Sequence, residues 1–199
     1  MNDSGCQSFP TRALAVTSLV AACLVAGALP LLASDTLGVG NPDKSDITLA
    51  STVCPLGEFA IGVHYRGGWY LNAVQLRCGT ISQGAVVFTR DAEWAGASGG
   101  DKGSFANCAP GKVVVGISAM GGTYVDAIRN YQCATVNTST RAVSASVSNT
   151  GSFVGGTGGA RTDLRCPANK ALRMVSVKRG SWIDYMVGTD CRTLTSDPQ

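Results

Sequence analysis

The chain has 199 residues, of which 45% are hydrophobic and 15% are charged, and its formal net charge is +3. This length suits one domain, and apolar content without blocks of like charge excludes an intrinsically disordered chain. Because the weak positive charge is scattered rather than clustered, we expect no nucleic-acid partner.

The N-terminal segment has the order of a secretory signal peptide. Arg12 precedes an uncharged run over residues 13–33, so we predict a signal peptide over 1–34 and a single domain over 35–199. Two alternatives stay open. Cys23 ends a Val-Ala-Ala-Cys stretch that resembles a lipobox, and the uncharged run is long enough for an uncleaved membrane anchor. All three interpretations place the domain in a secreted, periplasmic or extracellular location, with membrane contact only through this segment.

Six cysteines follow in the rest of the chain, and an even set in an exported protein is typical of a disulfide framework. None has Cys-x-x-Cys spacing, and His64 is the only histidine. We therefore expect neither a metal site nor a cofactor.

Three copies of one repeat begin at Cys54, Cys108 and Cys166. In each copy an apolar stretch leads to a glycine turn, then to an aromatic residue, a β-branched residue or leucine, and Asn or Asp. Repetition within one chain indicates a repeat architecture.

Each copy is expected to form a β-hairpin, because its two halves are rich in strand-forming residues and a glycine turn lies between them. The expected strands are 59–65 with 70–76, 113–119 with 124–131, and 171–178 with 182–187. The turn lies midway between two cysteines, so folding the hairpin brings them together. We predict the disulfides Cys54–Cys78, Cys108–Cys133 and Cys166–Cys191, each stabilising the fold by up to roughly 3.5 kcal/mol.

The segments between the copies carry further strands, expected at 85–89 and 141–147, and each strand is followed by a glycine cluster. The two chain termini together are long enough to complete a third such unit, with a strand at 46–49 and a reduced glycine cluster at 38–40. This closure predicts an all-β, three-sided prism with about four strands per sheet, because a linear solenoid would leave its edges exposed.

The pattern Cys-Pro-x-Gly…Gly-x-x-x-Asp-x-Ile/Val…Cys over residues 35–199 resembles the vitelline membrane outer layer family and, more distantly, jacalin-like lectins. This resemblance implies a three-fold pseudo-symmetric β-prism of Greek-key sheets. Jacalin-like lectins bind sugars through a glycine-rich loop and a Gly-x-x-x-Asp loop, whereas outer-layer proteins are structural and are linked to chito-oligosaccharides. The first copy departs from the motif, since it runs from Gly68 to Asn72.

Three groups of residues are candidates for carbohydrate binding. Glycine clusters would let a ligand approach the backbone, Gly-x-x-x-Asp motifs would grip hydroxyls, and tryptophans without counterparts in the other copies would stack on sugar rings. The alternative roles are bends, ties to turn backbone and packing under a loop. The candidates are Gly99, Gly100, Gly158 and Gly159; Gly122 with Asp126; Gly180 with Asp184; and Trp69 and Trp94. In contrast, Tyr70, Tyr124 and Trp182 recur in every copy, which favours packing.

No catalytic set stands out, because no feature of the sequence marks a serine as an activated nucleophile. His64 aligns with serines in the other two copies, which indicates an exposed position on a strand. The sequence therefore predicts a non-catalytic, lectin-like protein whose partner is a glycan or a cell-surface polysaccharide. The alternative is a structural envelope, coat or protein-binding module. A glycan-active enzyme using Asp91 and Glu93 is a third and weaker interpretation.

Overall fold

The computed structural model describes residues 38–44 and 48–194. The chain divides after Ala33, and every described residue belongs to the unit that follows. The predicted signal peptide at 1–34, with its lipobox and anchor alternatives, lies outside the described residues. Across the described ranges, no helix is long and apolar enough to cross a membrane.

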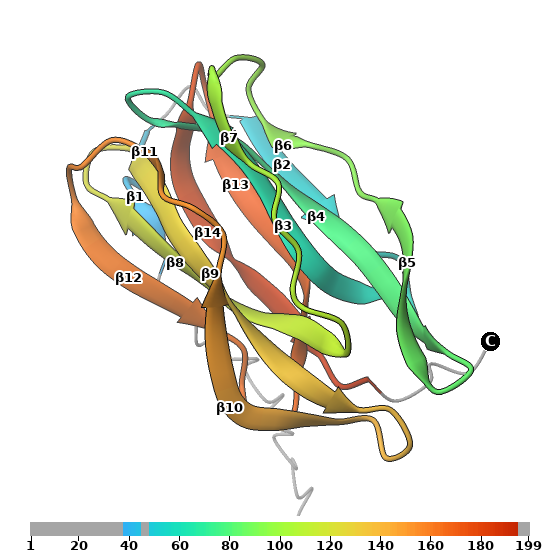
Figure 1. Ribbon diagram of the computed structural model, residues 1–199. Coiled ribbons are helices and arrows are strands. Elements are labelled where there is room, and N and C mark those ends of the chain that lie inside the picture. Colours follow the sequence, from blue (N-terminus) through green and yellow to red (C-terminus); the bar gives the residue numbers. More distant parts are fainter. Residues whose placement is uncertain (1–37, 45–47, 195–199) are drawn as a thin grey trace, which may run out of the picture. The chain divides into compact units, whose positions relative to one another are not determined.

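The described residues form three antiparallel sheets (Figure 1). The β3–β4 sheet contains β3 (Phe59–Gly67), β4 (Leu71–Ser82), β5 (Ala85–Asp91), β6 (Ala95–Gly96) and β7 (Lys102–Ser104). The β8–β9 sheet contains β8 (Lys112–Gly121), β9 (Val125–Asn137), β10 (Ala142–Thr150), β11 (Val154–Gly155) and β12 (Ala160–Arg165). The β13–β14 sheet contains β13 (Ala171–Arg179), β14 (Ile183–Arg192), β1 (Val39–Gly40) and β2 (Thr48–Val53).

Each sheet has a central hairpin and a returning edge strand. The strand order is β5-β4-β3-β7 in the first sheet and β10-β9-β8-β12 in the second, which is the Greek-key order. In the third sheet β1 and β2 come from the segment before the first repeat, so the prediction that this segment helps to complete the third unit is confirmed. Within the described ranges, however, this sheet has no counterpart of β5 and β10.

The core lies between the three sheets, where β3, β8 and β13 contact one another. Side chains that alternate along each strand point inward, as expected of a sheet with one buried face. The same positions recur in every repeat and are fully buried: Val63, Ile117 and Val175; Leu71, Val125 and Ile183; and Val74, Ile128 and Met186. The fold is the predicted all-β prism of three Greek-key sheets.

All three predicted disulfides are present. The Cα atoms are 5.5 Å apart in Cys54–Cys78, 5.8 Å in Cys108–Cys133 and 5.5 Å in Cys166–Cys191. In each bond the first cysteine lies just before the hairpin. The second lies on the returning strand, where Cys78 faces Ala60, Cys133 faces Val114 and Cys191 faces Leu172. The pairings are those predicted, although the bonded cysteines are not partners in the hairpin register.

One expectation about the sheet surface was wrong. His64 is only 5% exposed, whereas its alignment with serines had suggested an open strand position. Phe105, just after β7, packs against the imidazole in an edge contact with ring centroids 5.3 Å apart. The residue that covers His64 comes from a distant part of the chain, so the local pattern carried no sign of this burial.

Candidate functional site

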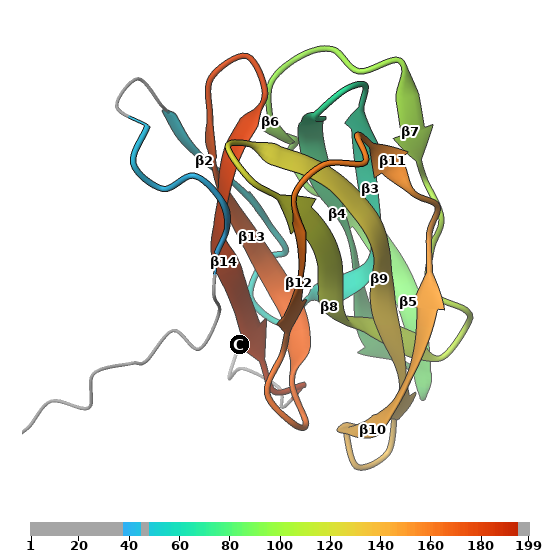
Figure 2. The same cartoon turned by 90° about the vertical axis from the view of Figure 1, so that its left-hand side faces the viewer.

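The turns of the three central hairpins lie at one end of the prism, together with the glycine-rich loops (Figures 1 and 2). One aromatic ring from each turn meets the other two. The centroid distances are 4.7 Å for Tyr70–Tyr124, 5.2 Å for Tyr70–Trp182 and 5.6 Å for Tyr124–Trp182. Tilted and edge contacts at these distances are favourable, so the packing role expected of this column is confirmed.

Asp126 faces the loop between β11 and β12. A β-carbon on Gly159 would lie 2.5 Å from Asp126 Oδ2, and one on Gly158 would lie 3.0 Å from Oδ1. Gly159 also has φ +73°, a conformation that favours glycine. Gly122 lies close by, because a β-carbon there would be 3.7 Å from Gly159 Cα and 3.9 Å from Asp126 Oδ2. The structure thus brings together four predicted residues, which we call the Asp126 site: Gly122, Asp126, Gly158 and Gly159.

The Asp126 carboxylate is incompletely satisfied. Its Oδ2 is buried and has no hydrogen-bond partner in the described part of the chain. Burial raises the pKa of Asp126, and the backbone N–H groups of Gly122 and of Asp126 itself offset part of this rise. An unpartnered acceptor beside an exposed glycine loop is suited to receive a hydroxyl donor from a ligand.

The equivalent position in the β3–β4 sheet is Asn72, which is 7% exposed. A β-carbon on Gly100 would lie 3.1 Å from Asn72 Oδ1, and one on Gly99 would lie 3.4 Å from Nδ2. The predicted glycine pair therefore meets a neutral amide instead of a carboxylate. Trp94 is half-buried and has the Arg66 guanidinium 4.7 Å from its ring centroid, so a cation already lies against the indole.

Asp184 of the β13–β14 sheet has partners on both oxygens. Gly180 N–H donates to Oδ2 over 2.6 Å, and Lys44 Nζ lies 2.9 Å from Oδ1. Lys44 also stands 3.3 Å from the Tyr124 ring centroid. The side chain of Asp184 ties its own turn to the segment before β2, which is the structural role that the sequence left open for this residue type.

Trp69 stands on the turn between β3 and β4 and is 86% exposed. It borders the glycine loop of the neighbouring sheet, because a β-carbon on Gly156 would lie 2.4 Å from the Trp69 carbonyl oxygen. Gly156 N–H in turn donates to the Asp126 carbonyl over 3.0 Å. Trp69 is therefore next to the Asp126 site, although the two belong to different repeats.

Lys44 was not among the predicted residues. The only local signal is that the segment joining β1 to β2 carries Asn41, Pro42 and Asp43 where the other sheets have glycine pairs. In the described ranges there is no group of three or more His, Cys, Asp and Glu side chains that could hold a metal ion.

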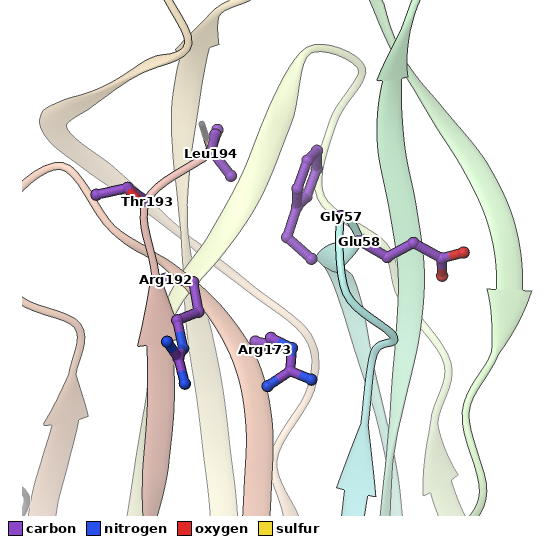
Figure 3. A pocket seen from close by; sticks show the side chains of 7 residues that line it. Gly57, Glu58, Arg173, Arg192, Thr193 and Leu194 are labelled. Carbon is purple, nitrogen blue, oxygen red and sulfur yellow. The ribbon is translucent and has the colours of Figure 1, made fainter. Parts of the chain in front are cut away.

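A small cavity lies between the start of β3 and the strands β13 and β14 (Figure 3). Its volume is about 30 Å³, which admits little more than one water molecule. Asp190 pairs with Arg173 at 3.3 Å and with Arg192 at 3.1 Å. Glu58 points away from both arginines and pairs with Arg90 of β5 at 3.1 Å. The charged side chains around the cavity therefore form ion pairs with residues of the same chain.

No protein-family model and no curated protein sequence matches the chain. Among solved structures, the prostate-specific WGA16 glycoprotein lectin aligns with a TM-score of 0.51 and 12% identity, over 78% of this chain and 98% of the lectin. Calystegia sepium agglutinin aligns with a TM-score of 0.48 and 14% identity, over 79% of this chain and 97% of the agglutinin. AcmJRL, a mannose-binding jacalin-related lectin from Ananas comosus, aligns with a TM-score of 0.43 and 13% identity, over 80% of this chain and 99% of the lectin. At 12% identity the first likeness concerns the fold alone, and this chain is a β-prism protein. The resemblance to the vitelline membrane outer layer family stays a prediction.

Proposed function

We propose that the protein is an exported, non-catalytic carbohydrate-binding protein whose principal binding site is the Asp126 site. The observation that carries this proposal is the unpartnered Asp126 Oδ2 beside the exposed backbone at Gly158 and Gly159. Three disulfides support export, because such bonds persist in oxidising compartments.

In this proposal two adjacent sugar hydroxyls donate to the Asp126 carboxylate. The absence of side chains at Gly158 and Gly159 lets the pyranose ring approach the loop backbone, whose N–H groups then donate to ring substituents. Trp69 provides an exposed aromatic face beside the loop for the apolar C–H face of a sugar unit. These contacts are shallow, and they bind a ligand without supplying a catalytic pair.

The other two repeats are proposed to bind weakly or not at all. Asp184 is satisfied by Lys44 and Gly180, so a hydroxyl would have to displace an ion pair. Asn72 offers an uncharged acceptor, and hydrogen bonds to charged groups are about twice as strong as neutral ones.

The test is a glycan array that includes chitin and peptidoglycan fragments, probed with the purified protein. Saturable binding that Asp126→Asn weakens at least tenfold, and that Asp184→Asn leaves within twofold, would support the proposed site. Binding that Asp184→Asn abolishes and Asp126→Asn leaves intact would move the site to the β13–β14 sheet. A blank array would favour the structural envelope, coat or protein-binding role instead.

A further inference from the structure

A second candidate site lies on the β8–β9 sheet, toward the end that carries the disulfides. It is an open groove of about 490 Å³, which falls within the usual range for small-molecule sites. We call it the Gln132 groove, lined chiefly by Val115, Gln132, Val143, Val147, Arg165 and Lys170. None of the Asp126 site residues lines it, so the inference is independent of the proposed sugar site.

The groove exists because β10 arches away from β9. Val143 pairs with Val136 and Val147 pairs with Ala134, so a four-residue step on β10 faces a two-residue step on β9. The extra residues bulge outward and form one wall. Asn169, in the loop after β12, accepts a hydrogen bond from Val143 N–H over 2.8 Å, which links the two edges of the curled sheet across the groove.

The floor of the groove holds a buried amide without partners. Gln132 is 1% exposed, and neither its Nε2 nor its Oε1 has a hydrogen-bond partner among the described residues. Its Oε1 occupies the space over Gly116, where a β-carbon would lie 2.3 Å away. Leaving a buried polar group unsatisfied destabilises a fold, so this amide requires an explanation.

The other two repeats show that the fold does not require an orphaned group here. Gln132 pairs with Gly116 across the hairpin, as Arg77 pairs with Gly62 and Asp190 with Met174. Arg77 lies 3.7 Å from Asp91 and 4.1 Å from the Phe88 ring centroid. Asp190 pairs with two arginines. The equivalent charged side chains are thus satisfied internally, and only Gln132 is left with an open groove in front of it.

The lining defines the ligand class. It contains no acidic and no aromatic side chain, which disfavours a sugar, and its valines offer an apolar wall. Arg165 also pairs with Gly116, so it lies across that glycine from Gln132. Neither Arg165 nor Lys170 forms a salt bridge in the described ranges. We propose that the groove binds a free aliphatic monocarboxylate, with its carboxylate on Arg165 and Gln132 Nε2 and its chain along Val115, Val143 and Val147.

Decanoate below its micellar concentration is the probe, measured by isothermal titration calorimetry with the purified protein. We expect saturable one-to-one binding, at least tenfold weaker for neutral decanol and for butanoate. Arg165→Gln should weaken decanoate binding at least tenfold. The matched control Arg129→Gln removes the same charge from an exposed position on β9 outside the groove and should change affinity less than twofold. Absence of saturable binding, or equal binding by both variants, would overturn the proposal.

Gln132→Leu separates a binding role from a structural one. Because it removes an unsatisfied amide, it should leave the melting temperature unchanged or raise it while weakening decanoate binding. A lower melting temperature with full binding would mean that Gln132 serves the fold. Ala145→Trp, at an exposed position on the β10 arch, should block the groove without touching the core. Undiminished decanoate binding in that variant would place the ligand elsewhere and refute the groove.

Discussion

Lys44 Nζ lies 2.9 Å from Asp184 Oδ1 and 3.3 Å from the centroid of the Tyr124 ring. The ammonium therefore sits over the aromatic cluster and satisfies the carboxylate that corresponds to Asp126. Two sheets that share a fold and a motif differ at this point, because one supplies its own cation and the other leaves an oxygen without a partner.

Lys44→Met should lower the melting temperature more than a neutral surface substitution does, because it leaves Asp184 with one charge-assisted bond instead of two. Lys102→Met is the control, since Lys102 is exposed and forms no salt bridge in the described residues. In a double-mutant cycle the loss should largely vanish in an Asp184→Asn background. An undiminished loss there would contradict the pairing.

Asp126 should make stability depend on pH in the direction opposite to an ion-paired acid. The pKa of Asp126 in the folded state is raised above 3.8, the usual value that applies to the unfolded chain. At pH values between these two pKa values the folded state binds more protons than the unfolded state, so stability falls as pH rises. Asp126→Asn should therefore raise the melting temperature at pH 7, and the difference should disappear near pH 3. Thermal unfolding of both proteins across this range is the measurement.

Asp163 is the matched control for that experiment. Burial raises its pKa, but hydrogen bonds with Ser118 and Arg161 and the charges of Arg161 and Arg165 outweigh burial, so the net pKa is lowered. Asp163→Asn should accordingly reduce the melting temperature at pH 7 and have no effect well below pH 3.8. If both variants shift stability in the same direction, the assignment for Asp126 is wrong.

Glycan affinity should follow the ionisation of Asp126. The carboxylate accepts hydroxyl hydrogen bonds on both oxygens, and more strongly than the protonated acid does, so affinity should decline as pH falls through the raised pKa of Asp126. Titrations of an array hit between pH 3 and pH 8 would show this. The midpoint of the decline should lie above the usual aspartate value, and Asp126→Asn should abolish the pH dependence.

Thr52 joins two sheets through one buried hydrogen bond. Its Oγ1 accepts from Leu76 N–H over 2.9 Å, and both residues are fully buried. Thr52→Val keeps the shape but leaves that N–H unsatisfied, so urea denaturation should show a loss of about 1–3 kcal/mol. Ser51→Ala, at the exposed neighbouring position, should stay within about 0.5 kcal/mol of the wild type. Equal effects of the two variants would argue against this bond.

Removing one disulfide should be costly, since each bond joins residues 24 or 25 positions apart and so restricts the unfolded chain. The double variant Cys108→Ala with Cys133→Ala should lose about 2–5 kcal/mol of stability. Non-reducing peptide mapping of the purified protein should recover three bonds, each within one repeat. A bond between repeats would contradict the hairpin pairing.

Local periodicity was enough to predict each hairpin. In every copy the strand-forming runs, the glycine turn and the two cysteines depend on residues fewer than thirty positions apart, and they predicted β3 with β4, β8 with β9 and β13 with β14. The prediction for His64 was wrong, and Lys44 was not predicted. The burial of His64 depends on Phe105, and the pairing of Asp184 depends on Lys44. In each case the contact joins segments that are far apart in the sequence.

Spacing along the chain was sufficient to predict the three repeats, the disulfides, the aromatic column and the closure into a prism. Which candidate residues lie in contact could be learned only from the folded chain. In the folded chain Asp126 lies next to Gly158 and Gly159, and Asp184 forms an ion pair with Lys44. The side-chain amide of Gln132 has no hydrogen-bond partner among the described residues. The physical reason is that these contacts depend on how strongly each sheet curls and where its edge strands bulge. Those features arise from packing among all three sheets.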